Sequence, residues 1–385
     1  MNESEVEPTK TLIIKRLKAW TFTVGILSCT VLGSIFIITP LLPLIIFRPR
    51  LWRWIMDRLI GMWVIWPGAL MEFLFGAEIT ISGDKIEHEE PGLIIMNHRT
   101  RLDWLFFWNA LYRMDPWLCK TEKISMKGIL KMIPGAGWAM SSNAFLFLDR
   151  QFESDKGKMD KMVDYYSRTH NSYQLLLFPE GTDKCPRATG RSQVYAEKKG
   201  LEHYQQVLHP RSTGFVHIVR TMRHLNYIRF IYDVTVGYPE DLVQTEQELV
   251  LHGMCPSKVQ YQVRKIPIES VPEDDVALDR WLRELWKGKE EKLKEYYSRP
   301  ADTRKFSSDA EPDYQLTPTS RLVRLFLTVM WVFTTLFWIF AFLQLKFIMY
   351  FSVLSLLIFI AIGRFFGGIE WMAIQFFPKS QPTEK

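Results

Sequence analysis

Uncharged, apolar stretches lie near both ends of the chain and are long enough to cross a membrane. Residues 19–47 carry no charged side chain, and a helix needs roughly 20 residues to span the hydrocarbon core. We predict a transmembrane helix there, kinked or ended near one interface by Pro40 and Pro43. A cleaved signal peptide is the alternative, but the apolar run is longer than such segments and lacks a small-residue cleavage site.

Two further stretches extend this pattern. Residues 51–75 are rich in Trp and sparsely charged, which favours a position in the membrane interface over a second, shallow membrane helix. Residues 325–345 are uncharged and long enough to span, and 347–363 follow after Lys346. A membrane hairpin with a tight turn near Lys346 fits this pattern better than one long tilted helix, because the combined run exceeds the thickness of a bilayer.

The region between the apolar ends has the pattern of a globular domain. Short apolar runs of strand length alternate with stretches of helical periodicity, which predicts a layered α/β domain around a central, mostly parallel sheet. Residues 298–319, rich in Pro, Asp and Ser, read as a linker. The expected strands are 93–96, 144–148, 175–178, 232–236 and 259–263, and the expected helices are 101–112, 158–168, 213–225 and a charged surface helix at 276–297.

These patterns divide the chain into five parts, with transmembrane helices on both sides of the α/β domain. The expected boundaries are an N-terminal tail at 1–18, a transmembrane helix with the Trp-rich interfacial segment at 19–76, the α/β domain at 77–297, the linker at 298–320, and the hairpin with its tail at 321–385.

Composition and charge narrow the function classes. The mean hydropathy of -0.04 argues against a polytopic transporter. The net charge of +6 suits an anionic bilayer, and nucleic acid is not expected as a partner because the chain has no Cys/His finger and no long Lys/Arg tract. The 4 cysteines are widely spaced without a Cys-x-x-Cys pair, so we expect reduced thiols and no metal site.

A histidine and an aspartate follow the first expected strand. His98 stands at the carboxyl end of the strand, where ligand sites of α/β sheets gather. Thr100 could cap the next helix, and Asp103 in its first turn could fold back toward His98. A carboxylate that orients a histidine makes a general base. On spacing alone, a surface histidine beside an unrelated aspartate is the more common outcome.

Three other segments carry candidate anion contacts. Phe-Pro-Glu-Gly-Thr at 178–182 follows a strand; its Gly181 allows close backbone approach, and Thr182 with the backbone amides can bind an anionic oxygen. The strand at 144–148 leads to Arg150, whose guanidinium can hold phosphate through two hydrogen bonds. The third segment, 207–215, is a rigid polar loop before a helix. Each segment alone could be an ordinary turn.

Taken together and in this order, the four segments resemble the glycerophospholipid acyltransferase (1-acyl-sn-glycerol-3-phosphate acyltransferase) family. Its signature is an Asn-His-x4-Asp block, a strand ending in Arg, a Phe-Pro-Glu-Gly-Thr block and a Pro-containing loop. Residues 97–104, 131–138, 207–215 and 365–370 are also similar to the lysocardiolipin acyltransferase branch.

One position departs from the broad family. Many members carry Arg directly after Phe-Pro-Glu-Gly-Thr, whereas Asp183 stands here, as in the lysocardiolipin branch. Arg150, or Lys184, Arg187 and Arg191 in the loop after Thr182, would then supply the positive charge, and this basic loop would attract an anionic headgroup.

The resemblance implies direct acyl transfer from acyl-CoA to a hydroxyl of an anionic lysophospholipid during phospholipid remodelling. Lysocardiolipin and lysophosphatidylinositol are the implied acceptors, with lysophosphatidic acid as the alternative. His98 would be the base and Asp103 its orienting carboxylate. No bound cofactor and no metal are implied. The implied substrate-binding residues are Arg150, Glu180, Gly181, Thr182, Pro210 and Arg211.

Two rival functions remain at this point. A lipase or transacylase would use a covalent acyl-enzyme, but the chain has no Gly-x-Ser-x-Gly elbow. An inactive relative that organises membrane is the other, and intact His98, Asp103 and Glu180 argue against it. The family and its lipid chemistry imply a multi-pass protein of the endoplasmic reticulum membrane, or of mitochondria-associated membranes, with its α/β domain on the cytosolic side.

Overall fold

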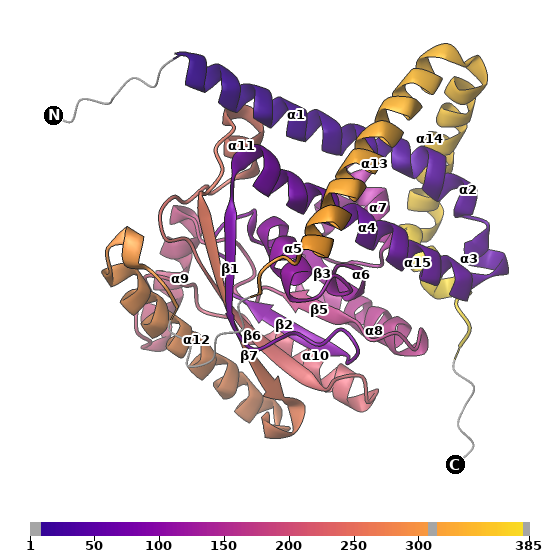
Figure 1. The fold of residues 1–385 in the computed structure, drawn as a ribbon. Helices are drawn as coiled ribbons and strands as arrows, with labels where there is room; N and C mark the ends of the chain where they lie inside the picture. Colours follow the sequence, from indigo (N-terminus) through magenta and orange to yellow (C-terminus); the bar gives the residue numbers. More distant parts are fainter. Residues whose placement is uncertain (1–8, 307–313, 380–385) are drawn as a thin grey trace.

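A computed structural model describes residues 9–306 and 314–379, which fold around a seven-stranded sheet (Figure 1). The strand order is β1-β7-β6-β2-β5-β3-β4. Every neighbouring pair is parallel except β6 and β7, so the sheet is mostly parallel, as predicted. The strands are β1 (Glu78–Gly83), β2 (Gly92–Met96), β3 (Glu122–Lys127), β4 (Leu146–Leu148), β5 (Gln174–Leu177), β6 (Phe230–Gly237) and β7 (Lys258–Pro267).

Strand β2 lies in the middle of the sheet and is buried on both faces. Leu93 and Ile95 belong to one hydrophobic cluster, while Ile94 and Met96 belong to the other. Because side chains alternate between the two faces of a strand, a continuous apolar run is required where helices cover both faces. This explains why β2 was readable from the sequence.

The predicted strands are present with shifted ends, and two others were missed. The strand expected at 144–148 is shorter, because Ala144 adopts a φ of 55° and is not extended. Strands β1 and β3 were not predicted, since charged residues such as Glu122 and Lys123 interrupt their apolar pattern.

Helices cover both faces of the sheet. On one face, the core contains residues of α4, α5 and α6; on the other it contains residues of α8, α10 and α12. The predicted helices are confirmed within a few residues, except that 158–168 belongs to a longer helix. These helices are α4 (Pro49–Phe75), α5 (Asp103–Met114), α6 (Leu118–Thr121), α8 (Phe152–Arg168), α10 (Ser212–His224) and α12 (Asp275–Ser298).

Helix α12 corrects one expectation. We expected a charged surface helix, but Trp286 and Lys289 are buried. The Lys289 ammonium lies 2.6 Å from a carboxylate oxygen of Asp233 on β6. Although its sequence is rich in charged residues, α12 packs against the sheet, and its buried Lys289 is paired with Asp233.

Four helical stretches of the described chain are long and apolar enough to cross a membrane: Lys10–Leu41, Pro49–Phe75, Pro318–Gln344 and Lys346–Phe366. The first stretch ends at a turn over Leu42 and Pro43, next to the expected break.

At the expected turn, only Leu345 separates α13 (Pro318–Gln344) from α14 (Lys346–Phe366). That the two helices form a membrane hairpin stays a prediction. The stretch expected in the interface forms one continuous helix, α4, and half of its apolar window is buried against protein. Its interfacial position stays a prediction. In Figure 1 these helices gather on one side of the sheet.

The remaining elements connect these layers. The N-terminal stretch is made of α1 (Thr9–Gly33), a π-helical turn (Ser34–Ile38), α2 (Thr39–Leu41) and α3 (Leu44–Phe47). The others are α7 (Ala136–Ser142), α9 (Pro186–Lys199), α11 (Glu246–His252), α13 (Pro318–Gln344), α14 (Lys346–Phe366), α15 (Ile369–Phe376) and short 3-10 turns at Gly128–Met132, Ile268–Ser270 and Ala301–Thr303.

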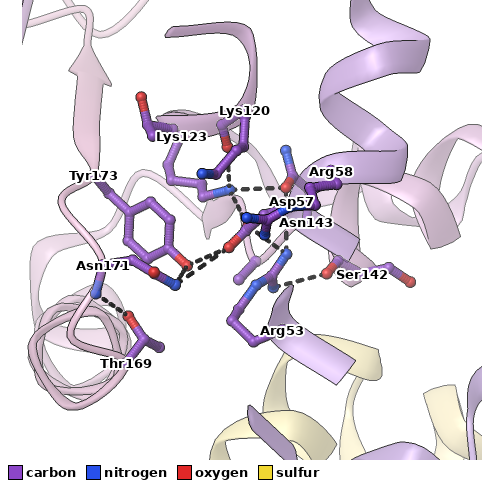
Figure 2. A network of polar contacts seen from close by, with 12 residues as sticks. Arg53, Asp57, Arg58, Lys120, Lys123, Ser142, Asn143, Thr169, Asn171 and Tyr173 are labelled. Atoms are coloured by element: carbon purple, nitrogen blue, oxygen red, sulfur yellow. Dashed lines mark hydrogen bonds and ion pairs between the residues drawn. The ribbon is translucent and has the colours of Figure 1, made fainter. Parts of the chain in front are cut away.

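A buried polar network ties α4 to the sheet (Figure 2). Asp57 on α4 accepts from Arg53 one turn earlier, at 2.8 Å, and from the Lys123 ammonium on β3, at 2.9 Å. Its other oxygen accepts from the Tyr173 hydroxyl at 2.7 Å. Lys123 also donates to Asn143, which precedes β4, at 2.8 Å. The Asp57 carboxylate therefore joins an apolar helix to β3 and to the segment before β5, and through Lys123 to the segment before β4.

The network holds two cations around one anion, all of them buried. Burial lowers the pKa of the Lys123 ammonium to about 8, and the Asp57 carboxylate opposes that shift. Removing one partner from such a cluster leaves an uncompensated charge away from water, which costs more than the pair itself contributes.

We expect Asp57→Asn to lower the free energy of unfolding by about 3 kcal/mol or more, since Arg53 and Lys123 lose their counter-charge. Thermal unfolding of the full chain in detergent micelles measures this. Arg58→Gln is the matched control on the same helix, because the Arg58 guanidinium lies over the Trp54 ring and donates to the Trp54 carbonyl, and it does not bond to Asp57. Equal unfolding temperatures for the two variants would contradict the role of the network.

Candidate active site

The structure brings His98 and Asp103 together. His98 follows β2, Asp103 is the first residue of α5, and the His98 Nδ1 atom lies 2.9 Å from Asp103 Oδ2. The backbone N–H of Thr100 donates to the same carboxylate oxygen at 3.0 Å, which closes the turn between strand and helix. The other ring nitrogen, Nε2, remains for a group in the cavity that His98 lines.

The cap expected from Thr100 is not formed as predicted. Leu102 occupies the N-cap position without a side-chain cap, and the helix begins at Asp103. The Thr100 hydroxyl instead accepts from the Leu102 N–H at 3.1 Å, inside the turn. The Asp103 carboxylate accepts from the backbone N–H of Thr100 as well as contacting His98, so residues 100–102 form a turn and the helix begins only at Asp103.

Asp103 is fully buried, and Tyr238 holds its second oxygen. The Tyr238 hydroxyl donates to Asp103 Oδ1 at 2.6 Å. Burial raises the pKa of the Tyr238 phenol well above its usual value, and the neighbouring carboxylate adds to this effect. Tyr238 is therefore a neutral donor that fixes the carboxylate. Tyr238 was not predicted from the sequence. It follows β6 directly, but that β6 lies next to β2 is known only from the sheet order.

The parallel neighbour β5 places Phe178 and Glu180 beside His98. Ile95 of β2 pairs with Leu177 of β5, so the segments that follow both strands leave the same edge of the sheet. The Phe178 ring stacks on the His98 ring with centroids 4.1 Å apart, which restrains the imidazole.

The carboxyl group of Glu180 accepts hydrogen bonds from protein N–H groups. Its carboxylate accepts from the backbone N–H groups of His98 and Leu208 and from the indole N–H of Trp286, each at 3.2 Å. Burial raises the pKa of Glu180 to about 8, and the three donors oppose this shift. A substrate-binding role was expected, but these contacts favour a positioning role that fixes the backbone at His98 and at the loop before α10.

A cavity of about 370 Å³ lies beside His98 and is lined by Lys127, Arg150 and Gly181. Burial lowers the pKa of Lys127, and the nearby Arg150 adds to this effect. Lys127 was not identified from the sequence, since it lies at the end of the unpredicted strand β3. Arg101 also lines this cavity, but it is paired with Asp183 and Glu246. The cavity walls thus bring two cations that have no ion pair in the described part of the chain, Lys127 and Arg150, to the general-base candidate.

Two further cavities continue past Arg150. One of about 260 Å³ shares Arg150 and Gly181 with the first cavity and adds Arg211. Another, of about 340 Å³, contains Thr182, Pro210 and Arg211. The predicted anion contacts therefore lie along one series of adjoining cavities.

Gly181 is required by this arrangement. Its φ of +74° is rarely adopted by residues with a side chain, and a Cβ there would lie 3.2 Å from Cδ of Arg211. The Thr182 hydroxyl donates to Asp183 at 3.3 Å. Asp183, which departs from the broad family pattern, is buried and lies 3.6 Å from the Arg101 guanidinium.

The three cations expected in one basic loop lie in two different elements: Lys184 lies in the loop, and Arg187 and Arg191 lie on a helix. Arg187 and Arg191 lie on helix α9 and not in a loop. Arg191 lines the cavity of about 340 Å³, whereas Lys184 and Arg187 line none of these three cavities. The backbone N–H of Lys184 donates to the His98 carbonyl at 2.8 Å. The loop ends after a few residues because Pro186 starts a helix.

Across residues 9–306 and 314–379, no group of three or more His, Cys, Asp or Glu side chains is arranged to hold a metal ion. The site described above is built from one histidine, buried carboxylates that position it, and cations on the cavity walls.

Comparisons with known proteins identify relatives of this chain. Residues 78–239 match the family described as acyltransferase, and residues 249–331 match the acyltransferase C-terminus. The chain is 46% identical to lysophosphatidylinositol acyltransferase 10 of Caenorhabditis elegans, over 74% of this chain and 73% of that protein. It is 39% identical to lysocardiolipin acyltransferase 1 of Gallus gallus, over 94% of this chain and 95% of that protein.

A solved structure is also similar, the 1-acyl-sn-glycerophosphate acyltransferase of Thermotoga maritima. The TM-score is 0.43 at 14% sequence identity, and the match covers 73% of this chain and 98% of that chain.

The raised pKa of Glu180 predicts a pH-dependent stability. Because the folded protein binds this proton more tightly than the unfolded chain does, the stabilisation is full below about pH 4.5 and is lost as pH rises through about 8. Gln cannot ionise, so the stability advantage of wild type over Glu180→Gln should shrink from about pH 5 to about pH 9. Thermal unfolding across this range measures the difference.

The matched control is Glu291→Gln, at an exposed position of α12. Its unfolding temperature should follow that of wild type at every pH. A difference between wild type and Glu180→Gln that is the same at both ends of the range would show that Glu180 does not hold its proton in the fold.

Proposed function

Because this chain belongs to the acyltransferase family, we propose that it transfers a fatty acyl group from acyl-CoA to the free hydroxyl of an anionic lysophospholipid. The observation that carries this proposal is the His98–Asp103 pair, whose carboxylate is buried, beside a cavity lined by Lys127 and Arg150. Relatives named for lysophosphatidylinositol and lysocardiolipin support the acceptor class. The reaction would serve phospholipid remodelling.

The proposed reaction needs no covalent enzyme intermediate. Nε2 of His98 takes the proton of the acceptor hydroxyl, and the oxygen attacks the thioester carbonyl. The carbon–sulfur bond then breaks, and the CoA sulfur leaves with the proton from His98. Asp103 stabilises the imidazolium that forms between these steps, and it holds the ring so that Nδ1 carries the other proton.

The cations provide the anion contact. Arg150 and Lys127 line the same cavity as His98, so a phosphate between them would place a neighbouring hydroxyl near the base. Arg150 can bind two phosphate oxygens at once, whereas Lys127 acts as a point charge. Gly181 leaves room for the acceptor because it has no side chain on this wall.

An apolar rim beside the cavity favours entry of the acceptor from a bilayer. Leu130 and Ile133 line the cavity, while their neighbours Ile129 and Met132 are exposed. Exposed large apolar side chains next to a substrate cavity are typical of a membrane-contacting surface. We propose that this rim rests on the endoplasmic reticulum membrane, with the α/β domain on the cytosolic side where acyl-CoA is available.

We expect His98→Ala to lower turnover at least about 100-fold, since a positioned general base contributes that much or more. Asp103→Asn should be nearly as severe, and the double variant should be no worse than His98→Ala, because the two residues act as one unit. An acyl-CoA-dependent assay on the purified full chain, with a panel of lysophospholipids, measures this.

The chain offers a matched control for this experiment. His88 and Asp115 form a second histidine–carboxylate pair, with 2.8 Å between Nδ1 and Oδ2, outside the cavity. His88→Ala should keep most of the activity. If His98→Ala retained a tenth of wild-type turnover, the proposed base would be wrong.

We expect anionic acceptors to be preferred, with lysophosphatidylinositol or lysocardiolipin ahead of lysophosphatidylcholine. The attraction arises from the cations of the cavity, so the preference should shrink as ionic strength rises. Arg150→Gln should reduce kcat/KM for anionic acceptors about tenfold, the size of one charge-assisted hydrogen bond. Equal use of lysophosphatidylcholine at low salt would contradict the preference and its electrostatic cause.

A further inference from the structure

The cavity of about 340 Å³ next to the catalytic site contains two arginines that have no protein partner. Arg191 comes from α9, and Arg211 comes from the loop before α10. Within residues 9–306 and 314–379, neither guanidinium forms an ion pair or hydrogen bond with the protein. We propose that Arg191 and Arg211 form a second phosphate subsite, separate from the contact at Arg150. This inference rests on the proposed function.

The electrostatics of the region favour an anionic ligand. Burial lowers the pKa of Arg150, and the charges of Arg211 and Arg191 lower it further, while Asp183 opposes them. Arg150 therefore lies close enough to both guanidinium groups to be affected by their charge. Arg191 and Arg211 are exposed within the cavity, so their charges are accessible to an anion that enters it.

The third arginine that lines this cavity, Arg283, is bonded to protein partners and stabilises the fold. Arg283 donates from Nε and Nη2 to Asp279, at 3.0 Å each, and from Nη1 to the Tyr195 hydroxyl at 3.1 Å. These bonds fix the wall of the cavity and neutralise the charge. Glu180 also contributes to the wall, but its oxygens already accept from protein N–H groups. Arg191 and Arg211 remain available to a ligand.

The position of Arg211 connects this subsite to the reaction. Its backbone N–H donates to the Pro179 carbonyl at 2.7 Å, which holds it against the segment after β5. Arg211 also lines the middle cavity, which shares Arg150 and Gly181 with the cavity of His98. A substrate that reacts at His98 and contacts Arg150 could therefore extend a second phosphate to Arg211 and Arg191.

Both proposed substrates can supply such a group. Acyl-CoA carries a 3′-phosphate on its ribose in addition to its diphosphate, and lysocardiolipin carries two phosphates where lysophosphatidylinositol carries one. The shared chemistry is a phosphate held by two guanidinium groups, which bind phosphate oxygens in a bidentate geometry. The two sources differ in which substrate loses affinity when an arginine is removed.

The test compares KM values of the purified full chain and of Arg191→Gln on two matched pairs of substrates. One pair is acyl-CoA and acyl-dephospho-CoA, which lacks the 3′-phosphate; the other is lysocardiolipin and lysophosphatidylinositol. We expect the variant to raise KM about tenfold for the member of one pair that carries the extra phosphate, and to leave the other member unchanged. Which pair responds identifies the source.

Two variants serve as controls on the same helix. Arg191→Lys keeps the charge and should recover part of the loss. Arg187→Gln removes an exposed cation one turn away that lines none of the three cavities, and it should behave as wild type. If Arg191→Gln changed neither pair, or raised KM equally for both members of each pair, the second subsite would be ruled out.

A binding measurement separates this inference from the proposed function. Adenosine 3′,5′-bisphosphate, or cardiolipin in mixed micelles, should raise the unfolding temperature of wild type more than that of Arg191→Gln. This difference does not depend on which residue is the base, so it can hold even if His98→Ala remains active. Equal stabilisation of wild type and Arg191→Gln by both probes would overturn the subsite while leaving the role of His98 intact.

Discussion

The parallel register of β2 between β5 and β6 is the constraint on which the candidate site depends. Ile95 pairs with Leu177 and Met96 pairs with Val234, so the three strands end at one edge of the sheet. His98, Phe178 and Tyr238 follow these strands and meet there, although they are far apart in sequence. A shift of one residue in either pairing would turn every side chain of the shifted strand to the opposite face and separate the histidine from its partners.

Buried carboxylates hold the chain segments around this edge. Asp103 accepts hydrogen bonds from the turn after β2 and from Tyr238. Glu180 accepts from the backbone of His98 and from Trp286 on α12, and Asp57 joins α4 to the sheet. Each of these buried acidic groups is costly to remove from water, whether ionised or protonated, and each is stabilised only when every surrounding donor is in place. Such groups therefore select one arrangement of the loops, which is what a general base at fixed distance from its substrate requires.

The cations of the domain divide into two groups by their partners. Lys123, Lys289 and Arg283 are bonded to carboxylates and serve the fold. Arg150, Arg191, Arg211 and Lys127 line the adjoining cavities, and no ion pair within the described residues neutralises them. The second group concentrates positive charge along the cavities proposed to take the anionic substrates, beside exposed apolar residues that suit a membrane surface.

Features that depend on neighbouring residues could be predicted from the sequence: the apolar helices long enough to cross a membrane, the doubly buried strands such as β2, and the short spacing that lets Asp103 reach His98. The sequence by itself did not reveal strands β1 and β3, the buried face of α12, or the roles of Tyr238 and Lys127, and it assigned Arg187 and Arg191 to a loop. These depend on contacts between segments distant in the chain. Periodicity and spacing report local geometry, whereas the partners of a buried polar group are decided only when the sheet register and the packing of helices bring them within hydrogen-bond distance.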